Sequence, residues 1–554
     1  MPSKKIAILS MFSMGLAACG GGGNASNPTT ATSNTPPSAP APSSSTSSVT
    51  INGKITYDFV PHQSQGFGLD YNNISERPAQ NIVVQLSDAD GNIIDTDITD
   101  RDGDYQFSTQ PNTQVKVSAL AQMVSDGQAD WDFIITDNTQ NNAVYALSGA
   151  LTSSGTSSQT RNLHAPSGWD GNSYSQTRAG APFAILGAAY QSTNLLASVD
   201  NNVALPSLEI RWSQNNRAIL GDRSIGHIGS SAYFDDIDDG VIYLLGDADS
   251  DTDEYDPHVV VHEIGHFIED KLSRTDTIGG LHGLGDRLDP RLAMSEGFSN
   301  AFSAIVLDEP VYKDSSGAGQ NSGFSFDIER SATRNQGWFN ELSVAGIIYD
   351  IYDSNNDEFD HISAGFAPIY EALTHSDFKS SNVFTTIYSF ADSITQNTRV
   401  NSSDLNILMS GQDIFGQGKT AQGETNNGSI MSTIPLYKTA VLDGPQAEIC
   451  SVVDAGNFNK LGNREYISFS IPQSGTYSLS MQRLDGKTRS DPDFEIWSAG
   501  ELVMQARNAQ EDQESFTGHF EAGEYYLEAY DFFNINGVSA RRGDVCFEFG
   551  LTST

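Results

Sequence analysis

The chain has little cysteine and little positive charge, and each shortage excludes a class of protein. Three cysteines in 554 residues exclude the dense disulfide framework of small secreted domains. Only 30 lysines and arginines stand against 70 aspartates and glutamates, which gives a formal net charge of −40. This charge argues against nucleic-acid partners and against direct adsorption to an anionic bilayer.

Long apolar runs are also missing, apart from a short one at the N-terminus. Two lysines precede residues 6–18, which are too few to span a bilayer and end in Leu-Ala-Ala before Cys19. This pattern resembles a bacterial lipoprotein signal peptide at 1–18, which implies cleavage before Cys19 and acylation of its thiol. Because Gly20 rather than an acid follows, the pattern is similar to that of lipoproteins sent to the outer membrane. We therefore expect a lipid-anchored protein of the bacterial cell envelope, either periplasmic or surface-exposed.

Residues 19–48 are rich in Gly, Ser, Thr, Pro and Asn and are predicted to be a disordered linker. The next segment, 49–160, shows period-two alternation and turn signals, with strand patterns at 51–57, 82–86 and 103–107 and a hairpin signal at Asp90-Gly91. It resembles the carboxypeptidase-regulatory-like β-sandwich found on secreted enzymes. Another type of sandwich and an inhibitory pro-segment are the alternatives.

Two of the ten histidines stand in the pentapeptide His262-Glu263-Ile264-Gly265-His266, inside an apolar run. On a helix, residues four apart lie on one face, so both imidazoles can converge on one ion while the glutamate points at its open side. This geometry is typical of a zinc hydrolase. His258 is excluded as a further ligand, because it lies eight residues before His266, about 12 Å along a helix axis.

Catalytic zinc needs a third protein ligand and an open position for water. A second helix is predicted at 294–302, where Glu296 and Asn300 share one face. The Gly and His that continue the metzincin motif are absent after His266. The pattern resembles the gluzincin clan, the thermolysin-like and fungalysin-like metallopeptidases, and this resemblance implies His262, His266 and Glu296 as zinc ligands. Many gluzincins carry an acid where Asn300 stands, so we expect Asn300 to orient a ligand histidine with weaker electronic tuning.

The gluzincin resemblance implies hydrolysis of peptide bonds. Zinc lowers the pKa of its bound water, and Glu263 would accept the proton and pass it to the leaving amine. A Tyr or His side chain usually helps zinc to stabilise the oxyanion in such enzymes. Tyr349, Tyr352 and His361 are candidates for this role, and the sequence does not choose among them.

The middle segment, 161–445, is the expected zinc metallopeptidase domain. Its patterns predict a helix beginning within 178–186, strands at 208–212 and 241–246, and helices at 341–353 and 383–394. A strand beside a gluzincin cleft typically pairs with the extended substrate. Either 231–233 or 242–244 could supply that strand.

Two loops adjoin the zinc helix. The acidic loop 247–256 has alternating aspartates that could bind calcium, but it lacks the Gly and the terminal Glu of an EF-hand. A solvated loop is therefore the favoured reading, with calcium as a second candidate ion. The loop 279–291 links the two ligand helices, and His282 or Arg287 could contact substrate there. An internally salt-bridged loop is the alternative.

The last segment, 446–554, has short alternating strands with Gly-x-Tyr entries. It resembles the bacterial pre-peptidase C-terminal domain, a β-sandwich appended to exported peptidases. Once Cys19 is set aside, Cys450 and Cys546 remain, and such a pair in an exported protein is most simply a disulfide. Closing so long a loop is worth about 4 to 5 kcal/mol in the chain-entropy account.

Together these features predict a multidomain chain in which an α+β gluzincin metallopeptidase domain lies between two all-β sandwich domains. The expected function is zinc-dependent hydrolysis of protein or peptide substrates, with Glu263 as general base and a membrane link through Cys19. The alternative is a surface-binding lipoprotein or adhesin with a structural or inactive zinc site. The presence of Glu263 favours the enzyme, because a structural site has no use for a base beside the metal.

Overall fold

The structure is a computed structural model that describes residues 48–554 apart from 126, 236, 238–239, 331–333, 356–358 and 537–539. The expected signal peptide (1–18), Cys19 and the linker as far as residue 47 lie outside the described residues. The described residues belong to one compact unit. None of their helices combines the length and the apolar character that crossing a bilayer requires.

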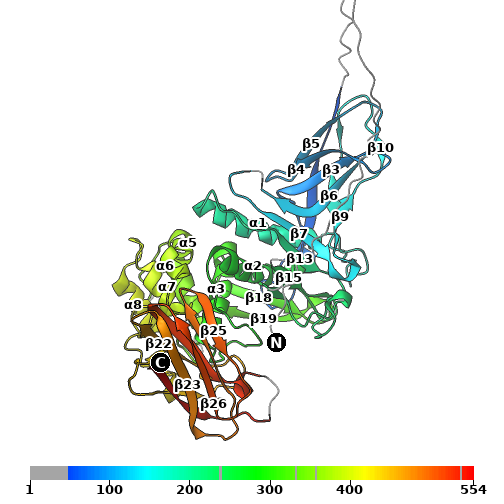
Figure 1. Ribbon diagram of the computed structural model, residues 1–554. Helices are drawn as coiled ribbons and strands as arrows, with labels where there is room; N and C mark the ends of the chain where they lie inside the picture. Colours follow the sequence, from blue (N-terminus) through cyan, green and yellow to red (C-terminus); the bar gives the residue numbers. More distant parts are fainter. Residues whose placement is uncertain are drawn as a thin grey trace, which may run out of the picture. The chain divides into compact units, whose positions relative to one another are not determined.

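The first part of the described chain is all β (Figure 1, blue to cyan). The small sheet is built around β1 (Val49–Phe59), which pairs with β2 (Ser75–Pro78), β5 (Asp104–Thr109), β11 (Gln159–Thr160) and β12 (Leu163–Ala165). Strand β5 alternates exposed and buried residues, as expected of a strand with one solvated face.

A larger sheet crosses the expected boundary at residue 160. Its strand order is β14 (Ala232–Phe234), β15 (Val241–Leu244), β13 (Leu208–Trp212), β7 (Asp132–Asp137), β6 (Gln114–Val124), β3 (Ile82–Ser87) and β4 (Ile93–Ile98). The short strands β8 (Ala143–Val144), β9 (Ala146–Ser148) and β10 (Thr152–Ser153) pair with β6 or β7. Strands β7 and β13 are parallel, with Phe133 opposite Leu208, so the sheet is continuous from the first segment into the middle one.

The core is continuous across the same boundary. Helix α1 (Ala181–Val199) packs on β6 and β7 and against α2 (Pro257–Leu272). Phe133 of β7 meets Phe267 of α2 edge to face, with ring centroids 5.8 Å apart. One cluster of buried apolar side chains runs from Ile51 in β1 to Tyr526 in the last segment. Residue 160 therefore marks neither the end of a sheet nor the end of a core.

The rest of the middle segment is mainly helical (Figure 1, green to yellow). Its helices are α3 (Pro290–Leu307), α4 (Glu341–Tyr352), α5 (Phe366–Thr374), α6 (Ser376–Lys379), α7 (Ile387–Ile394) and α8 (Ser402–Gly411). Two hairpins accompany them, β16 (Gly246–Asp247) with β17 (Asp251–Thr252) and β18 (Val311–Ser316) with β19 (Ser322–Asp327).

The helix predicted at 383–394 begins later than expected. Helix α7 starts at Ile387 because Thr386 caps it: the Thr386 hydroxyl accepts from the Ser389 backbone, and the Ser389 hydroxyl accepts from the Thr386 backbone. This reciprocal pair fixes the first turn, and the residues before Thr386 stay outside the helix.

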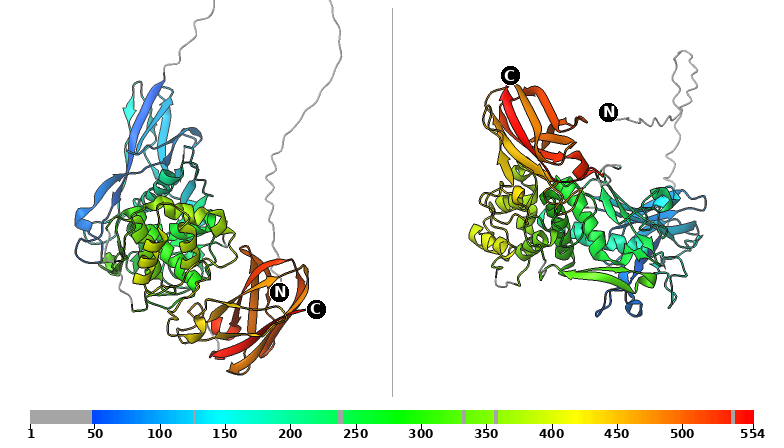
Figure 2. Two further views of the ribbon diagram at one scale, coloured as in Figure 1. Left: turned by 90° about the vertical axis from the view of Figure 1, so that its left-hand side faces the viewer. Right: turned by 90° about the horizontal axis from the view of Figure 1, so that it is seen from below.

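The last segment forms two layers with a core of their own, antiparallel apart from the parallel pair of β20 and β22 (Figure 2, orange to red). One sheet has the order β20 (Tyr437–Thr439), β22 (Arg464–Ile471), β27 (Gly523–Asp531), β24 (Pro492–Ser498) and β25 (Glu501–Ala506). The other has the order β21 (Ala447–Ser451), β28 (Val545–Ser553), β23 (Gly475–Gly486) and β26 (Gln513–Phe520), and α9 (Phe532–Ile535) follows β27. We call residues 437–554 the C-terminal sandwich.

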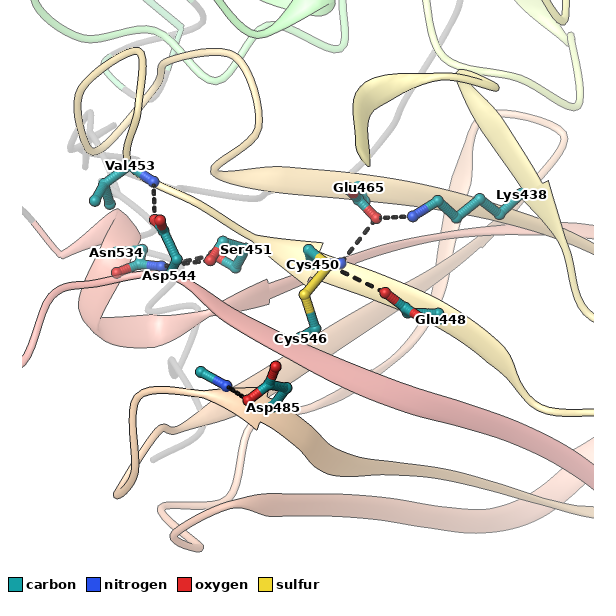
Figure 3. Close-up of a disulfide and its surroundings, with 11 residues drawn as sticks. Lys438, Glu448, Cys450, Ser451, Val453, Glu465, Asp485, Asn534, Asp544 and Cys546 are labelled. Carbon is teal, nitrogen blue, oxygen red and sulfur yellow. Dashed lines mark hydrogen bonds and ion pairs between the residues drawn. A yellow bond between two sulfur atoms is a disulfide. The ribbon is translucent and has the colours of Figure 1, made fainter. Parts of the chain in front are cut away.

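The C-terminal sandwich contains the expected disulfide. Cys450 of β21 and Cys546 of β28 are opposite each other in the ladder and are bonded through their sulfurs (Figure 3). The Cys450 backbone N–H donates to Glu465 of β22, at 2.9 Å, which links the disulfide to the other sheet.

Candidate metal centre

Helix α2 carries the paired histidines on a face that its own packing defines. Pro257 occupies the first turn, where a missing N–H costs nothing, and Val260, Val261 and Ile264 are buried. His258 is also buried, its Nδ1 lies 3.1 Å from the Ser303 hydroxyl, and burial lowers its pKa to about 3. His258 is therefore a neutral core histidine.

Helix α3 brings Glu296 to the two histidines. Its Oε2 lies 3.2 Å from His262 Nε2 and 3.4 Å from His266 Nε2, and the two imidazole nitrogens are 3.1 Å apart. Two glycines allow this close packing. A Cβ on Gly265 would lie 3.0 Å from the Ser299 Cα, and a Cβ on Gly297 would lie 2.5 Å from the Val344 Cβ of α4.

The three side chains fit a zinc ion. Four tetrahedral ligands at about 2.0–2.1 Å from zinc lie about 3.3 Å from one another, which agrees with the separations of 3.1 to 3.4 Å among His262, His266 and Glu296. Glu296 Oε2 is buried and lies against these two imidazole nitrogens. A buried carboxylate oxygen of this kind normally faces a cation, and the His/His/Glu donor set suits zinc.

Contacts on the far side of each imidazole hold its ring. His262 Nδ1 lies 3.0 Å from the Asn300 amide oxygen. His266 Nδ1 lies 3.1 Å from the hydroxyls of both Ser295 and Ser299. Because each Nδ1 is occupied, each Nε2 is left to face Glu296.

A chain of hydrogen bonds extends from His266 through Ser295 to Glu269. The Ser295 hydroxyl donates to Glu269 Oε2 at 2.5 Å, and burial raises the pKa of Glu269 to about 7. The sequence reasoning missed Ser295, Ser299 and Glu269. Glu269 follows His266 by three residues, and Ser295 and Ser299 lie beside Glu296 and Asn300, so helical spacing was the available signal.

His266 and Glu296 stabilise each other's charge. Burial opposes a charge on His266, but Glu296 overcomes it and raises the pKa of His266 to about 9. Burial also opposes the carboxylate of Glu296, yet His266 and the neighbouring histidines hold its pKa well below the usual range. Glu263, adjacent to His262 on α2, is 7% exposed.

The three expected oxyanion donors are not brought to this centre. Tyr352 donates to Asp308 at 3.4 Å, and Tyr349 packs against Tyr352 with ring centroids 5.9 Å apart. His361 is exposed. Within the described part of the chain, no contact joins any of the three to His262, His266 or Glu296.

The loop between α2 and α3 contributes a residue instead. His282 Nε2 lies 3.3 Å from Glu296 Oε2 and 3.4 Å from Glu341 Oε2 at the start of α4. Arg287 behaves differently, because its guanidinium donates to the backbone carbonyls of Gly428 and Asp454. Only His282 of these two loop residues reaches the candidate centre.

The acidic loop forms a second cluster of carboxylates. Asp251, Asp253 and Asp314 of β18 offer oxygens within 4.8 Å of one another. Burial, with the neighbouring carboxylates, raises the pKa of Asp251 to about 7 and that of Asp314 to about 8. Oxygen donors of this kind suit calcium, and calcium at the acidic loop stays a prediction.

Of the two candidate substrate-pairing strands, one lies at a sheet edge. Strand β15, which contains 242–244, is paired on both sides, with β13 and β14. Strand β14 ends the strand order of the large sheet. The structure therefore favours Ala232–Phe234 as a strand that a peptide could extend.

Part of the middle segment is similar to a known protein family. Residues 206–405 match the mycolysin C-terminal domain, and this range includes His262, Glu263, His266 and Glu296. The match supports a metallopeptidase-type enzyme. No match to a curated protein was found.

Solved structures were also compared with the chain. The precursor of protealysin, a metalloproteinase from Serratia proteamaculans, is 12% identical with a TM-score of 0.26, covering 53% of this chain and 89% of that one. The pre-peptidase C-terminal domain of the Bacillus anthracis collagenase is 11% identical with a TM-score of 0.15, covering 21% of this chain and 93% of that one.

Proposed function

We propose that the chain is a zinc-dependent endopeptidase of gluzincin type, with His262, His266 and Glu296 as metal ligands. The observation that carries this proposal is the convergence of three ligand atoms, 3.1 to 3.4 Å apart, from two packed helices. The mycolysin-family match over 206–405 supports the same class of enzyme.

The residues around the centre have distinct tasks in this proposal. A bound zinc ion supplies Lewis-acid activation of water and of the peptide carbonyl. Glu263 accepts the proton of the attacking water and delivers it to the leaving amine. Asn300, Ser295 and Ser299 hold the imidazoles in the tautomer that leaves Nε2 free as a ligand atom.

The substrates in this proposal are proteins or peptides in extended conformation. Strand β14 would pair with the substrate backbone, which supplies main-chain hydrogen bonds without regard to side-chain identity. Side-chain specificity would then come from the pockets around the pairing strand.

The proposed location is the bacterial cell envelope, with a lipid anchor at Cys19. Its support is the lysine-flanked apolar segment before Cys19 and the disulfide of the C-terminal sandwich, which is typical of an oxidising compartment. Cells that express the chain with a clickable fatty acid should label it, and Cys19→Ser should abolish the label. Labelling that persists in Cys19→Ser would contradict the anchor.

The catalytic proposal is tested with Glu263→Ala. We expect peptide hydrolysis to fall by roughly 10²- to 10⁴-fold, the usual contribution of a general base, while zinc content stays unchanged. Glu76→Ala, at an exposed position of β2, is the matched control and should keep full activity. Unchanged hydrolysis in Glu263→Ala would overturn the mechanism, and zinc without hydrolysis in any form would favour the binding-protein alternative.

A further inference from the structure

A second set of ligand atoms meets at Glu296, on the side of the loop between α2 and α3. His282 Nε2, Glu296 and Glu341 place their ligand atoms within 4.8 Å of one another, as do His262, His266 and Glu296. Glu296 belongs to both sets. The two sets draw on α2, α3, α4 and the loop that follows α2.

The three donor atoms of the second set are arranged as the ligands of a cation would be. His282 Nδ1 lies 3.1 Å from the Gly280 carbonyl oxygen, so this nitrogen carries the proton and donates it. The neutral ring would then aim the lone pair of Nε2 at two carboxylate oxygens, 3.3 and 3.4 Å away. A metal ion bound between these three atoms would accept all three lone pairs.

Both carboxylates of this second set are buried. Glu341 is 1% exposed, and its Oε1 is buried without a hydrogen-bond partner. Glu296 is 7% exposed, and its Oε2 lies 3.2 to 3.4 Å from the Nε2 atoms of His262, His266 and His282. Three histidines face Glu296, whereas Glu341 pairs with His282, so a further cation beside Glu341 would offset the cost of burying its charge.

The loop that carries His282 is held in place by the C-terminal sandwich. The Asn459 side chain donates to the Gly279 carbonyl at 2.8 Å, and Lys460 Nζ donates to the Leu281 carbonyl at 2.9 Å. Gly280 has a φ of +94°, and a Cβ there would lie 2.2 Å from the Phe458 ring. The backbone immediately before His282 is thus held by fixed contacts with the C-terminal sandwich.

We propose that the chain binds a second divalent metal ion through His282 and Glu341, with Glu296 shared between it and the zinc ion of the proposed function. Mixed imidazole and carboxylate donors suit zinc, and also manganese or cobalt. Two-metal hydrolytic sites have ions about 3.5 to 4 Å apart, a spacing that a shared carboxylate permits. This inference rests on the proposed function, because Glu296 is also one of the three zinc ligands proposed there.

The test is the metal stoichiometry of the full chain, purified in detergent, stripped of metal and titrated with zinc while calcium is in excess. Calcium fills oxygen-ligand sites such as the acidic loop, so the zinc count reports nitrogen-containing sites. We expect two zinc ions per chain in the wild type and one in both His282→Ala and Glu341→Gln. The control His519→Ala, an exposed histidine of β26, should keep two.

Each outcome has a defined meaning. One zinc ion in the wild type would overturn the second site and leave the proposed function standing, with His282 as an imidazolium between two carboxylates. No zinc in the wild type would overturn both, and two ions in every variant would place the second ion elsewhere. Electron paramagnetic resonance of the manganese-loaded protein gives a second readout. We expect two spin-coupled manganese ions in the wild type and one isolated ion in Glu341→Gln, which is nearly isosteric with the wild type.

Discussion

The two β-rich ends of the chain look alike in sequence and differ in how they are built. The N-terminal strands continue through β7 and β13 into the sheet beside the zinc helix, and Phe133 packs on Phe267 of α2. The C-terminal sandwich closes two sheets around a core of its own. It meets the middle segment through aromatic contacts of Phe384 with Tyr466 and Tyr526 and through ion pairs such as Arg291 with Glu528. Alternating strand patterns therefore predict β structure, but a domain's independence depends on which strand pairs with its edge.

Among the substitutions, removal of the disulfide should cause the largest loss of stability, and this loss should be confined to the C-terminal sandwich. Cys450 and Cys546 are separated by 96 residues, and losing such a cross-link costs about 4 to 5 kcal/mol in the chain-entropy account. In the double variant Cys450→Ser with Cys546→Ser, hydrogen exchange should accelerate in β21 to β28 and stay unchanged in β6 and β7. Faster exchange in β6 and β7 would contradict the separate core.

Matched phenylalanine truncations compare the two cores directly. Phe133→Ala and Phe469→Ala each remove a fully buried ring, at a typical cost of about 3 to 5 kcal/mol. Phe133→Ala should lower the denaturation midpoint of the β region and of the zinc helix together, and weaken zinc binding. Phe469→Ala should lower only the transition of the C-terminal sandwich. A larger loss of zinc affinity in Phe469→Ala than in Phe133→Ala would contradict the link between the N-terminal core and the zinc helix.

The polar contact between the sandwich and α3 gives a smaller effect. Arg291 is 2% exposed and pairs with Asp289 at 3.0 Å and with Glu528 at 2.7 Å. Glu528→Gln leaves the arginine charge less compensated, and we expect a loss of about 3 kcal/mol in the free energy of unfolding. Glu524→Gln, on the exposed part of the same strand, is the control and should change stability little. Equal stability of the two variants in guanidinium unfolding would show that this contact does not join the regions.

The stability of the sandwich should also depend on pH. Burial, with neighbouring carboxylates, raises the pKa of Asp493 from 3.8 to about 8, so the folded state binds this proton more tightly than the unfolded chain. Stability from this group is therefore present at low pH and lost as pH rises between about 4 and 8. Asp493→Asn should flatten this decline in the unfolding transition of the sandwich. An unchanged slope would assign the pH dependence to other groups.

Helical spacing made the main residues of the candidate centre predictable from the sequence. His262 and His266 are four apart on one helix, and Glu296 and Asn300 are four apart on the next, so each pair could be placed on one face from the sequence alone. The structure brings His262 to Asn300 at 3.0 Å and to Glu296 at 3.2 Å.

What could not be predicted depends on contacts between distant parts of the chain. His282 reaches Glu296 because Asn459 and Lys460, far along the sequence, fix the loop around it. The continuity of β7 with β13 likewise depends on pairing across a long connection. No local pattern encodes such pairings. For this reason the sequence predicts a boundary at residue 160 that the sheet crosses, and it leaves the role of His282 open.

The most direct test of zinc-dependent peptide hydrolysis uses the full chain. Its hydrolysis of a peptide is measured before metal removal, after metal removal, and after zinc is added back. The account predicts that hydrolysis is lost on chelation and restored by zinc in the wild type, and that Glu263→Ala takes up zinc without regaining activity. Full hydrolysis by the metal-free chain would contradict it.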